Sequence, residues 1–234
     1  GATDKGAAWV LFMNSSNTCA STQKIGAVDG NFNQSLTGKA YFGASLAPLG
    51  DLDSDGVNDM VVGASNLSNQ GRAYILFMNT DGTVSSVKQI KVTDLDNNPT
   101  PSSYVGTGIT NMGDLNGDGI VDIAVGAYLE KVSEYNAGAY YICFLDAAGN
   151  ITEYQRINNQ YGNLTASLQY VDEFGRAGAF LGDINNDGHP EFATGWAGDD
   201  DAASAAGSVV MLSLYSPTAL VEPDFYATLT KKLG

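Results

Sequence analysis

One acidic ten-residue segment occurs three times in this chain, and it limits the fold more than any other feature. The copies begin at Gly50, Gly113 and Gly182 and read GDLDSDGVND, GDLNGDGIVD and GDINNDGHPE. The aspartates that open the three loops, at positions 51, 114 and 183, are 63 and 69 residues apart. A period of this length is typical of a repeat architecture, in which each unit packs on its neighbours.

Each acidic segment is followed by two apolar runs separated by a variable loop. The first runs are 60–63, 123–126 and 192–195, the second are 72–78, 139–145 and 208–214, and the N-terminus carries the second run alone at 7–13. The runs are short, rich in β-branched and aromatic residues, and bounded by Gly, Asn and Asp, so they predict strands. Because they are continuously apolar, they favour sheets buried on both faces. With an edge strand such as 84–92, we expect an all-β fold of β-propeller blades, each of four antiparallel strands.

The composition excludes several classes of function. The 26 acidic and 11 basic side chains give a formal net charge of -15, which argues against binding to nucleic acid or to an anionic membrane surface. No run approaches the length of a membrane-spanning helix, so we expect no membrane insertion. Residues 1–9 lack a signal-peptide pattern, so we expect a signal peptide to be absent or already removed. Cys19 and Cys143 are too few for a disulfide framework and lie in non-neighbouring repeats, so we expect two free or buried thiols.

The segments around each loop resemble the FG-GAP repeat of integrin α-subunit β-propellers. The resemblance is carried by Phe42-Gly43, the acidic loop and Gly63-Ala64, with Val105-Gly106 and Gly195-Trp196 as departures from the pattern. It implies a larger propeller of about seven blades, of which this chain holds about 3.5 repeats. We expect one propeller segment over 1–234, with a trailing half blade at 1–41, blades at 42–104 and 105–173, and a blade plus the start of the next at 174–234.

The repeats do not add up to a closed ring, although the tail at 229–234 is similar to 36–43, which begins a unit. An open propeller would expose apolar faces and unpaired strand edges. We therefore expect the chain to be a segment of a longer repeat array, completed by the remainder of a longer chain or by self-association.

The acidic loops predict calcium sites. We number each loop from the aspartate that opens it, so that Asp51, Asp114 and Asp183 are position 1. Positions 1, 3, 5 and 9 offer oxygen ligands, position 7 offers a backbone carbonyl, and the glycine at position 6 allows a tight turn. Calcium tolerates such an irregular set of hard oxygen ligands. The resemblance implies the same ligands: Asp51, Asp53, Asp55, Val57 and Asp59; Asp114, Asn116, Asp118, Ile120 and Asp122; and Asp183, Asn185, Asp187, His189 and Glu191. We expect two to three Ca²⁺ ions in a structural role, and three would change the formal net charge from -15 to -9.

Two other interpretations of the loops are weaker. An EF-hand requires a bidentate Glu at position 12 between helices, and Val62, Val125 and Thr194 stand there inside predicted strands. Plain Asx turns would explain one such loop. Three loops in register, each with three or four carboxylates, would be repulsive without a cation.

No catalytic arrangement stands out, so we expect that the chain is not an enzyme. His189 is the only histidine and lies inside a predicted metal loop, which disfavours a nucleophile–His triad. The run Asp199-Asp200-Asp201 is the main acidic cluster outside the loops and is typical of a solvated loop. A carboxylate pair for glycoside hydrolysis stays open, because separations in space are not readable from sequence.

Binding is the favoured function, and the loops at the strand ends opposite the metal loops are expected to carry it. These loops are 65–70, 128–136, 197–206, 31–40, 94–103 and 160–173. Their candidate contact residues are Tyr128, Tyr135, Tyr161, Tyr170 and Trp196. For Trp196 the alternative is packing between blades. Calcium and the five sequons at Asn14, Asn33, Asn66, Asn150 and Asn163 favour an extracellular or cell-surface glycoprotein. We expect an adhesion or recognition module for protein or glycan ligands. The alternatives are a structural repeat of a cell-surface fibre, and a lectin or accessory domain of a secreted enzyme.

Overall fold

The chain forms an all-β structure of stacked antiparallel sheets. The computed structural model describes residues 4–95, 102–132, 135–164, 167–170, 172–199, 207–215 and 226–233. Sheet I contains β3 (Phe42–Gly50), β4 (Asp59–Ala64), β5 (Arg72–Met78) and β6 (Val84–Lys91). Sheet II contains β7 (Val105–Gly113), β8 (Asp122–Ala127), β11 (Ala139–Leu145) and β12 (Ile151–Ile157). Sheet III contains β13 (Gly178–Gly182), β14 (Glu191–Trp196), β15 (Ser208–Tyr215) and β16 (Tyr226–Leu233).

Within each sheet the strands lie side by side in chain order, so every neighbouring pair is an antiparallel hairpin. A hairpin of β1 (Ala8–Met13) and β2 (Cys19–Ile25) lies before sheet I, and a short hairpin of β9 (Lys131–Val132) and β10 (Tyr135–Asn136) leaves sheet II. The helical residues described are one-turn segments, η1 (Leu67–Asn69) and α1 (Val92–Leu95). The predicted all-β fold with four-stranded antiparallel blades is therefore confirmed.

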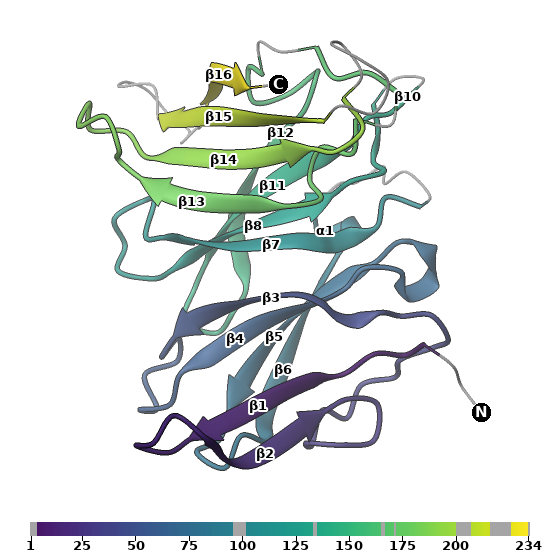
Figure 1. Cartoon of the computed structure of the whole chain (residues 1–234), viewed down its shortest axis with the longest axis vertical. Helices are drawn as coiled ribbons and strands as arrows, with labels where there is room; N and C mark the ends of the chain where they lie inside the picture. Colours follow the sequence, from purple (N-terminus) through teal and green to yellow (C-terminus); the bar gives the residue numbers. More distant parts are fainter. Residues whose placement is uncertain are drawn as a thin grey trace.

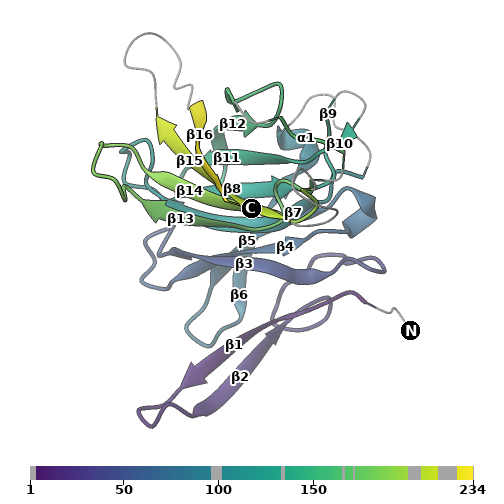
Figure 2. The same ribbon diagram turned by 45° about the horizontal axis from the view of Figure 1, so that its top comes forward.

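The sheets are stacked face to face in chain order, from the β1–β2 hairpin to sheet III (Figures 1 and 2). One hydrophobic cluster fills each space between neighbouring layers. Strand β5 shows the alternation: Tyr74 and Leu76 pack toward the β1–β2 hairpin, whereas Ile75 and Phe77 pack toward sheet II. Because both faces of β5 are buried, its sequence is continuously apolar rather than alternating.

The layers are joined where each first strand begins. Isolated parallel bridges connect Gly6 with Phe42, Gly71 with Val105, and Gly138 with Phe174. At each junction the amide of the later residue donates to a carbonyl of the preceding layer: Phe42 to Lys5 (2.9 Å), Val105 to Gln70 (2.8 Å) and Phe174 to Ala137 (3.1 Å). The dipeptide that opens each repeat is thus docked on the layer before it.

One expectation about the strands needs correction. The tail at 229–234 was expected to begin a further unit, but β16 pairs with β15 along its length and forms the fourth strand of sheet III. The edge of β15 needs a hydrogen-bonding partner, and the tail is the next strand along the chain, so this expectation is wrong.

The thiols agree with the sequence. Cys19 is exposed and Cys143 is buried, and within the described part of the chain neither forms a disulfide. Among the described residues no helix is long and apolar enough to cross a membrane.

Candidate metal sites

The three acidic loops connect the first and second strands of sheets I, II and III. They follow the ends of β3, β7 and β13 and lie together on the left side of Figure 1. Each first strand ends in a glycine with positive φ (Gly50, Gly113 and Gly182, at 69°, 66° and 66°). The same left-handed backbone turn therefore directs all three loops to the same edge of the stack.

Position 1 of each loop closes the turn. The carboxylate of Asp51 accepts the amides of Asp55 (2.9 Å) and Gly56 (3.0 Å). Asp114 accepts those of Asp118 (3.1 Å) and Gly119 (2.8 Å), and Asp183 those of Asp187 (3.1 Å) and Gly188 (2.9 Å). Three separate sequences thus adopt the same hydrogen-bond pattern, so the loops are three copies of one local structure.

Positions 3 and 5 repeat in the same way. The side-chain oxygens of Asp53, Asn116 and Asn185 accept the amide of position 5 at 3.3, 3.0 and 2.9 Å. The carboxylates at position 5 accept the amide of position 7, which belongs to Val57, Ile120 or His189, at 2.8, 2.7 and 2.9 Å. These side chains are exposed on the loop and are held by short-range backbone hydrogen bonds.

Position 9 is different because it is buried. Asp59, Asp122 and Glu191 are 3%, 0% and 1% exposed. Asp59 accepts the amides of Leu52 (3.0 Å) and Met78 (2.9 Å), so one carboxylate joins the loop to the end of the third strand. Asp122 makes the equivalent bonds to Leu115 (2.9 Å) and Leu145 (3.2 Å).

The third loop departs at this position because Glu191 is one methylene longer. Glu191 accepts the amide of Ile184 (3.0 Å) and the hydroxyl of Ser213 (2.8 Å), while the amide of Leu214 turns to the carbonyl of Pro190 (2.9 Å). Asn185 also donates to Glu191 at 3.2 Å. Position 9 therefore still joins the loop to the third strand of its sheet, but through different hydrogen-bond partners.

Burial perturbs the position 9 carboxylates. Desolvation raises the pKa of Asp122 to about 6, the amides of Leu115 and Leu145 oppose this shift, and Asp118 and Asp114 add to it. The pKa of Asp59 is raised for the same first reason, desolvation. A buried carboxylate beside other carboxylates is stabilised by a cation, so these groups favour a bound metal.

The donor set fits a hard divalent cation. In the first loop, carboxylate oxygens of Asp51, Asp53 and Asp59 lie within 4.8 Å of one another. The second and third loops carry Asn116 and Asn185 where the first has Asp53, which keeps an oxygen ligand at position 3. Side-chain oxygens without nitrogen or sulfur donors are the set that calcium and magnesium prefer, and calcium tolerates an irregular set of such ligands better than magnesium does.

Other predicted site residues have mixed outcomes. His189 is exposed in its loop, and its amide donates to the carboxylate of Asp187. Trp196 was a candidate contact residue, but it is 1% exposed and packs on Phe174 (5.9 Å between ring centroids), so its role is core packing between layers. Tyr161 and Tyr170 are 47% and 62% exposed. Parts of the candidate loops lie outside the described residues, namely 96–101, 133–134, 165–166, 171 and 200–206, which include Asp200 and Asp201. The side chain of Tyr135 also lies outside them.

A cluster at the opposite strand ends was only partly predicted. The rings of Tyr104 and Tyr128 lie 5.5 Å apart, and the guanidinium of Arg176 lies 5.4 Å from the centre of the Tyr128 ring. Burial first, and then the neighbouring Tyr104, raise the pKa of Tyr128. Tyr41 and Tyr104, which precede the opening dipeptides of sheets I and II, have φ values of 53° and 57°. Tyr41, Tyr104 and Tyr128 come from three separate segments of the chain. The one sequence signal that could have indicated their proximity is that Tyr41 and Tyr104 both directly precede an opening dipeptide.

The architecture and the loops together define a class of protein, the FG-GAP type of β-propeller repeat. A family model described as an FG-GAP-like repeat matches residues 51–125, and one described as an FG-GAP repeat matches residues 109–143. The chain therefore contains FG-GAP repeats, and it is related to integrin α-subunits over most of its length.

Three relatives illustrate the relationship. Integrin alpha-3 of Cricetulus griseus is 31% identical over 192 residues, which cover 79% of this chain and 17% of the relative. Integrin alpha-6 of Gallus gallus is 30% identical over 187 residues, which cover 78% of this chain and 16% of the relative. Integrin alpha-11 of Homo sapiens is 38% identical over 88 residues, which cover 38% of this chain and 7% of the relative. The chain thus spans less than a fifth of the length of these relatives.

Proposed function

We propose that this chain is a calcium-stabilised β-propeller module of an extracellular or cell-surface adhesion or recognition protein. The observation that carries the proposal is the threefold repetition of one oxygen-rich loop at one edge of the stack, with the buried position 9 carboxylate behind it. The relationship to integrin α-subunits supports the adhesion part of the proposal.

Calcium has a structural role in this proposal. The ligands in each site are the residues named from the sequence at positions 1, 3, 5, 7 and 9. A cation held by them stabilises the loop directly, and through Asp59 or Asp122 it also stabilises the end of the third strand. A fully coordinated calcium ion has no free position at which to activate water, so the role is non-catalytic.

The test is unfolding with and without calcium. A site with a dissociation constant of about 10⁻⁴–10⁻³ M contributes about 1–3 kcal/mol at about 10 mM calcium. Two or three sites together therefore raise the melting temperature by at least about 5 °C over the same protein in excess chelator. Native mass spectrometry counts the ions, and we expect two or three. No bound calcium and an equal melting temperature in both buffers would refute the calcium sites.

Ligand recognition is proposed at the strand ends opposite the acidic loops. Tyr41 is 45% exposed there, near the Tyr104–Tyr128 pair and Arg176. Left-handed backbone at bulky residues such as Tyr41 and Tyr104 costs free energy and clusters at functional sites. Aromatic faces beside a guanidinium suit either a glycan or a protein ligand.

Ligand binding is tested separately from calcium. A glycan array and candidate extracellular proteins are screened in calcium, and binders are tested again with Tyr41→Ala and Tyr128→Ala. Loss of binding with an unchanged melting temperature supports this surface. Unchanged binding by both variants assigns recognition elsewhere.

A structural repeat in a cell-surface assembly is the second candidate, and one observation favours it. Trp9, Leu11 and Met13 form an apolar stripe on the outer face of β1, and each is 57–58% exposed. Sedimentation of the purified chain distinguishes the two candidates, because assembly through this stripe gives a concentration-dependent mass that Leu11→Lys abolishes.

A further inference from the structure

The second acidic loop contains the single Asn-Gly pair of the sequence, Asn116-Gly117. An asparagine followed by glycine can react within its own chain, because the glycine carries no side chain to keep its amide nitrogen from the side-chain carbonyl carbon of the asparagine. Asn116 and Gly117 are both exposed, so water has access to the product of that step. The loop therefore holds a chemical reactivity that is separate from its set of oxygen ligands.

The other two acidic loops provide an internal comparison, because they share the backbone but not this residue pair. Position 4 has left-handed backbone in all three loops, with φ values of 63° at Ser54, 80° at Gly117 and 58° at Asn186. The pair at positions 3 and 4 is Asp53-Ser54 in the first loop and Asn185-Asn186 in the third. The second loop is thus the one that combines an asparagine at position 3 with a residue that lacks a side chain.

The amide that acts as nucleophile in such a reaction is hydrogen-bonded to a carboxylate. The amide of Gly117 donates to Asp114 Oδ1 at 2.7 Å, a distance at which a carboxylate can take up the proton of a reacting nitrogen. In the first and third loops, Asp51 and Asp183 accept the amides of positions 5 and 6. Within the described part of the chain, neither of them accepts the amide of position 4. The second loop therefore differs from its two copies at the reacting atom itself.

The side chain that is attacked is held at both of its polar atoms by Asp118. The amide of Asp118 donates to Asn116 Oδ1 at 3.0 Å, and Asn116 Nδ2 donates to the Asp118 carboxylate at 2.9 Å. The first contact stabilises the negative charge that develops on the oxygen when the carbonyl carbon is attacked. Asn185 makes the same two contacts with Asp187, at 2.9 Å each, so the third loop is a control for them.

We propose that Asn116 is a self-modification site, at which the amide nitrogen of Gly117 attacks the side chain of Asn116 and converts it to a carboxylate. The nitrogen forms a bond to Cγ of Asn116 and gives its proton to Asp114. The Cγ–Nδ2 bond breaks, and Nδ2 leaves as ammonia with that proton. Water then opens the resulting succinimide ring: its hydroxyl adds to a ring carbonyl carbon and its hydrogen returns to the Gly117 nitrogen. The net reaction consumes water and releases ammonia, with no oxidation or reduction.

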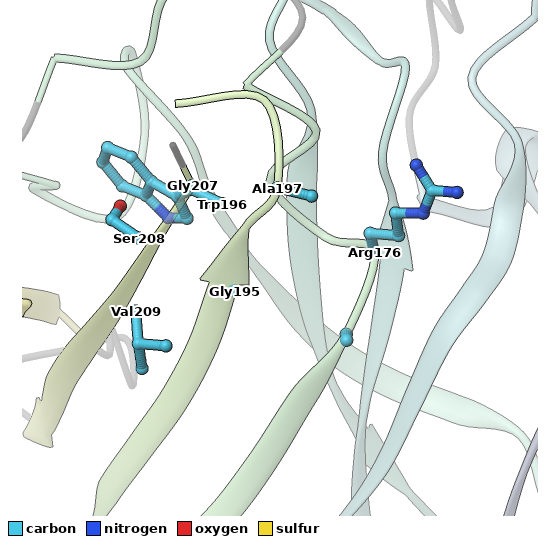
Figure 3. A pocket seen from close by; sticks show the side chains of 8 residues that line it. Arg176, Gly195, Trp196, Ala197, Gly207, Ser208 and Val209 are labelled. Carbon is cyan, nitrogen blue, oxygen red and sulfur yellow. The ribbon is translucent and has the colours of Figure 1, made fainter. Parts of the chain in front are cut away.

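The reaction needs no binding pocket, because both reacting groups belong to one loop and the water comes from solvent. The pocket in Figure 3, about 330 Å³ in volume and lined by Arg176, Trp196 and Gly207 among others, lies at the opposite strand ends and contributes no group to it. A Cβ atom added at Gly117 would meet nothing within 4 Å. The loop is thus open around the reacting pair, with room for the ring to form.

The products change the second loop in opposite directions. Opening of the ring at Cγ gives an aspartate at position 116, and the loop then has the carboxylate that the first loop has at Asp53. Opening at the other carbonyl gives an isoaspartate, which adds a carbon to the backbone and displaces the residues that follow. Because ligand charge tunes the calcium affinity of such loops, the first product strengthens a calcium site and the second disrupts it. This consequence rests on the proposed function, whereas the reaction itself does not.

The test follows the conversion of Asn116 in the purified chain, kept folded in excess chelator at mildly alkaline pH. Peptide mass spectrometry measures the fraction of each asparagine that has become an acid, and chromatography separates the aspartate and isoaspartate peptides. We expect Asn116 to react at least about tenfold faster than Asn185, which is about 1.4 kcal/mol in barrier. Equal rates at the two positions, or no conversion of Asn116, would overturn the proposal.

A variant at position 1 tests the assigned base. Asp114→Asn removes the proton acceptor and is expected to slow the conversion of Asn116 at least about tenfold in the folded chain. In urea, where the Gly117–Asp114 contact is lost, the variant and the parent are expected to react at the same rate. A folded Asp114→Asn chain that reacts as fast as the parent would show that the carboxylate has no part in the reaction.

A variant at position 4 keeps the proposal testable if Asp114→Asn does not fold. Gly117→Ser gives the second loop the residue that the first loop carries in the same backbone conformation, as Ser54. The variant is therefore expected to fold like the parent, while its side chain beside the reacting nitrogen slows the conversion of Asn116 at least about tenfold. A rate equal to that of the parent would overturn the proposal.

Calcium separates this proposal from the proposed function. An ion on the second loop holds Asn116 Oδ1 as a ligand, so saturating calcium is expected to slow the conversion of Asn116 in the folded chain and to leave the rate in urea unchanged. Conversion in chelator that calcium does not slow would count against the second calcium site and in favour of the self-modification. Bound calcium together with no conversion in chelator would refute the self-modification alone.

Discussion

The contact between neighbouring layers is tested most sharply by replacing Gly126 with alanine. Gly126 lies in β8 of sheet II, 49 residues before Gly175 in the chain. Its added Cβ would lie 1.8 Å from the oxygen and 2.7 Å from the carbonyl carbon of Gly175, and 3.1 Å from the oxygen of Gly108. All three atoms belong to the backbone, so no side-chain rotation relieves the overlap.

The cost follows from this geometry. Real Cβ atoms almost never approach another heavy atom closer than 3.0 Å, so the start of sheet III must move away by more than 1 Å. That shift lengthens the Phe174–Ala137 hydrogen bond, now 3.1 Å, beyond useful range. Overpacking costs about 1–3 kcal/mol and the lost hydrogen bond about 1 kcal/mol, while alanine recovers up to about 1 kcal/mol through the unfolded chain. Because the overlap is with backbone atoms, the upper end of the overpacking range applies, and the three values together give a net loss of about 3 kcal/mol.

The assay is thermal and urea unfolding in calcium, with Gly195→Ala as the matched control. A loss of about 3 kcal/mol lowers the melting temperature by about 6–12 °C for a chain of this size. The control makes the same change at the corresponding position of sheet III and is expected within about 0.5 kcal/mol of the parent. Equal melting temperatures for Gly126→Ala and Gly195→Ala would refute the assignment of the layer contacts.

Three further predictions concern the loops and the buried charges. Asp53→Ala is expected to reduce the number of calcium ions counted by native mass spectrometry by one and to lower the melting temperature in calcium. In excess chelator the variant is expected to be as stable as the parent or more stable, because one repelling carboxylate is gone. Asp122 has its pKa raised to about 6 in the folded chain against 3.8 as the ordinary value, so its proton binds the folded state more tightly. The metal-free protein therefore gains stability as pH falls from 7 toward 5, whereas calcium affinity measured by calorimetry falls over the same range. Glu130→Ala leaves the Arg156 guanidinium and the buried Tyr141 hydroxyl without this acceptor and costs about 3 kcal/mol in urea unfolding; a change below about 1 kcal/mol would contradict that role.

Most of the local structure was predictable because its causes are local. The apolar runs 72–78 and 139–145 became β5 and β11, with both faces buried as their composition indicated. The order of carboxylates and glycine in each acidic loop predicted a turn with converging oxygens, and Asp51 and Asp114 hold the same backbone amides in two loops of different sequence.

The special place of position 9 could not be read from the loop. The sequence treats Asp59 as one ligand among several, but its second partner, the amide of Met78, is 19 residues away. Asp122 also accepts the amide of Leu145, which is 23 residues away. Likewise, Trp196 is the last residue of β14 and could have been exposed, and its packing with Phe174 in the core cluster between sheets II and III decides that it is buried.

The amino-acid sequence by itself determined the strands, the three loops and the repeat to which they belong, because hydrophobic patterning and turn chemistry act within a few residues. Tertiary structure alone decided how one repeat meets the next. Gly63 and Gly126 look like any strand glycine until Gly106 and Gly175 are brought against them from the following sheet. The pairing of β16 with β15 was decided in the same way, since an unpaired strand edge takes the partner that the fold places beside it. Contacts between residues tens of positions apart depend on the packing of whole sheets, and that packing is a property of the folded chain.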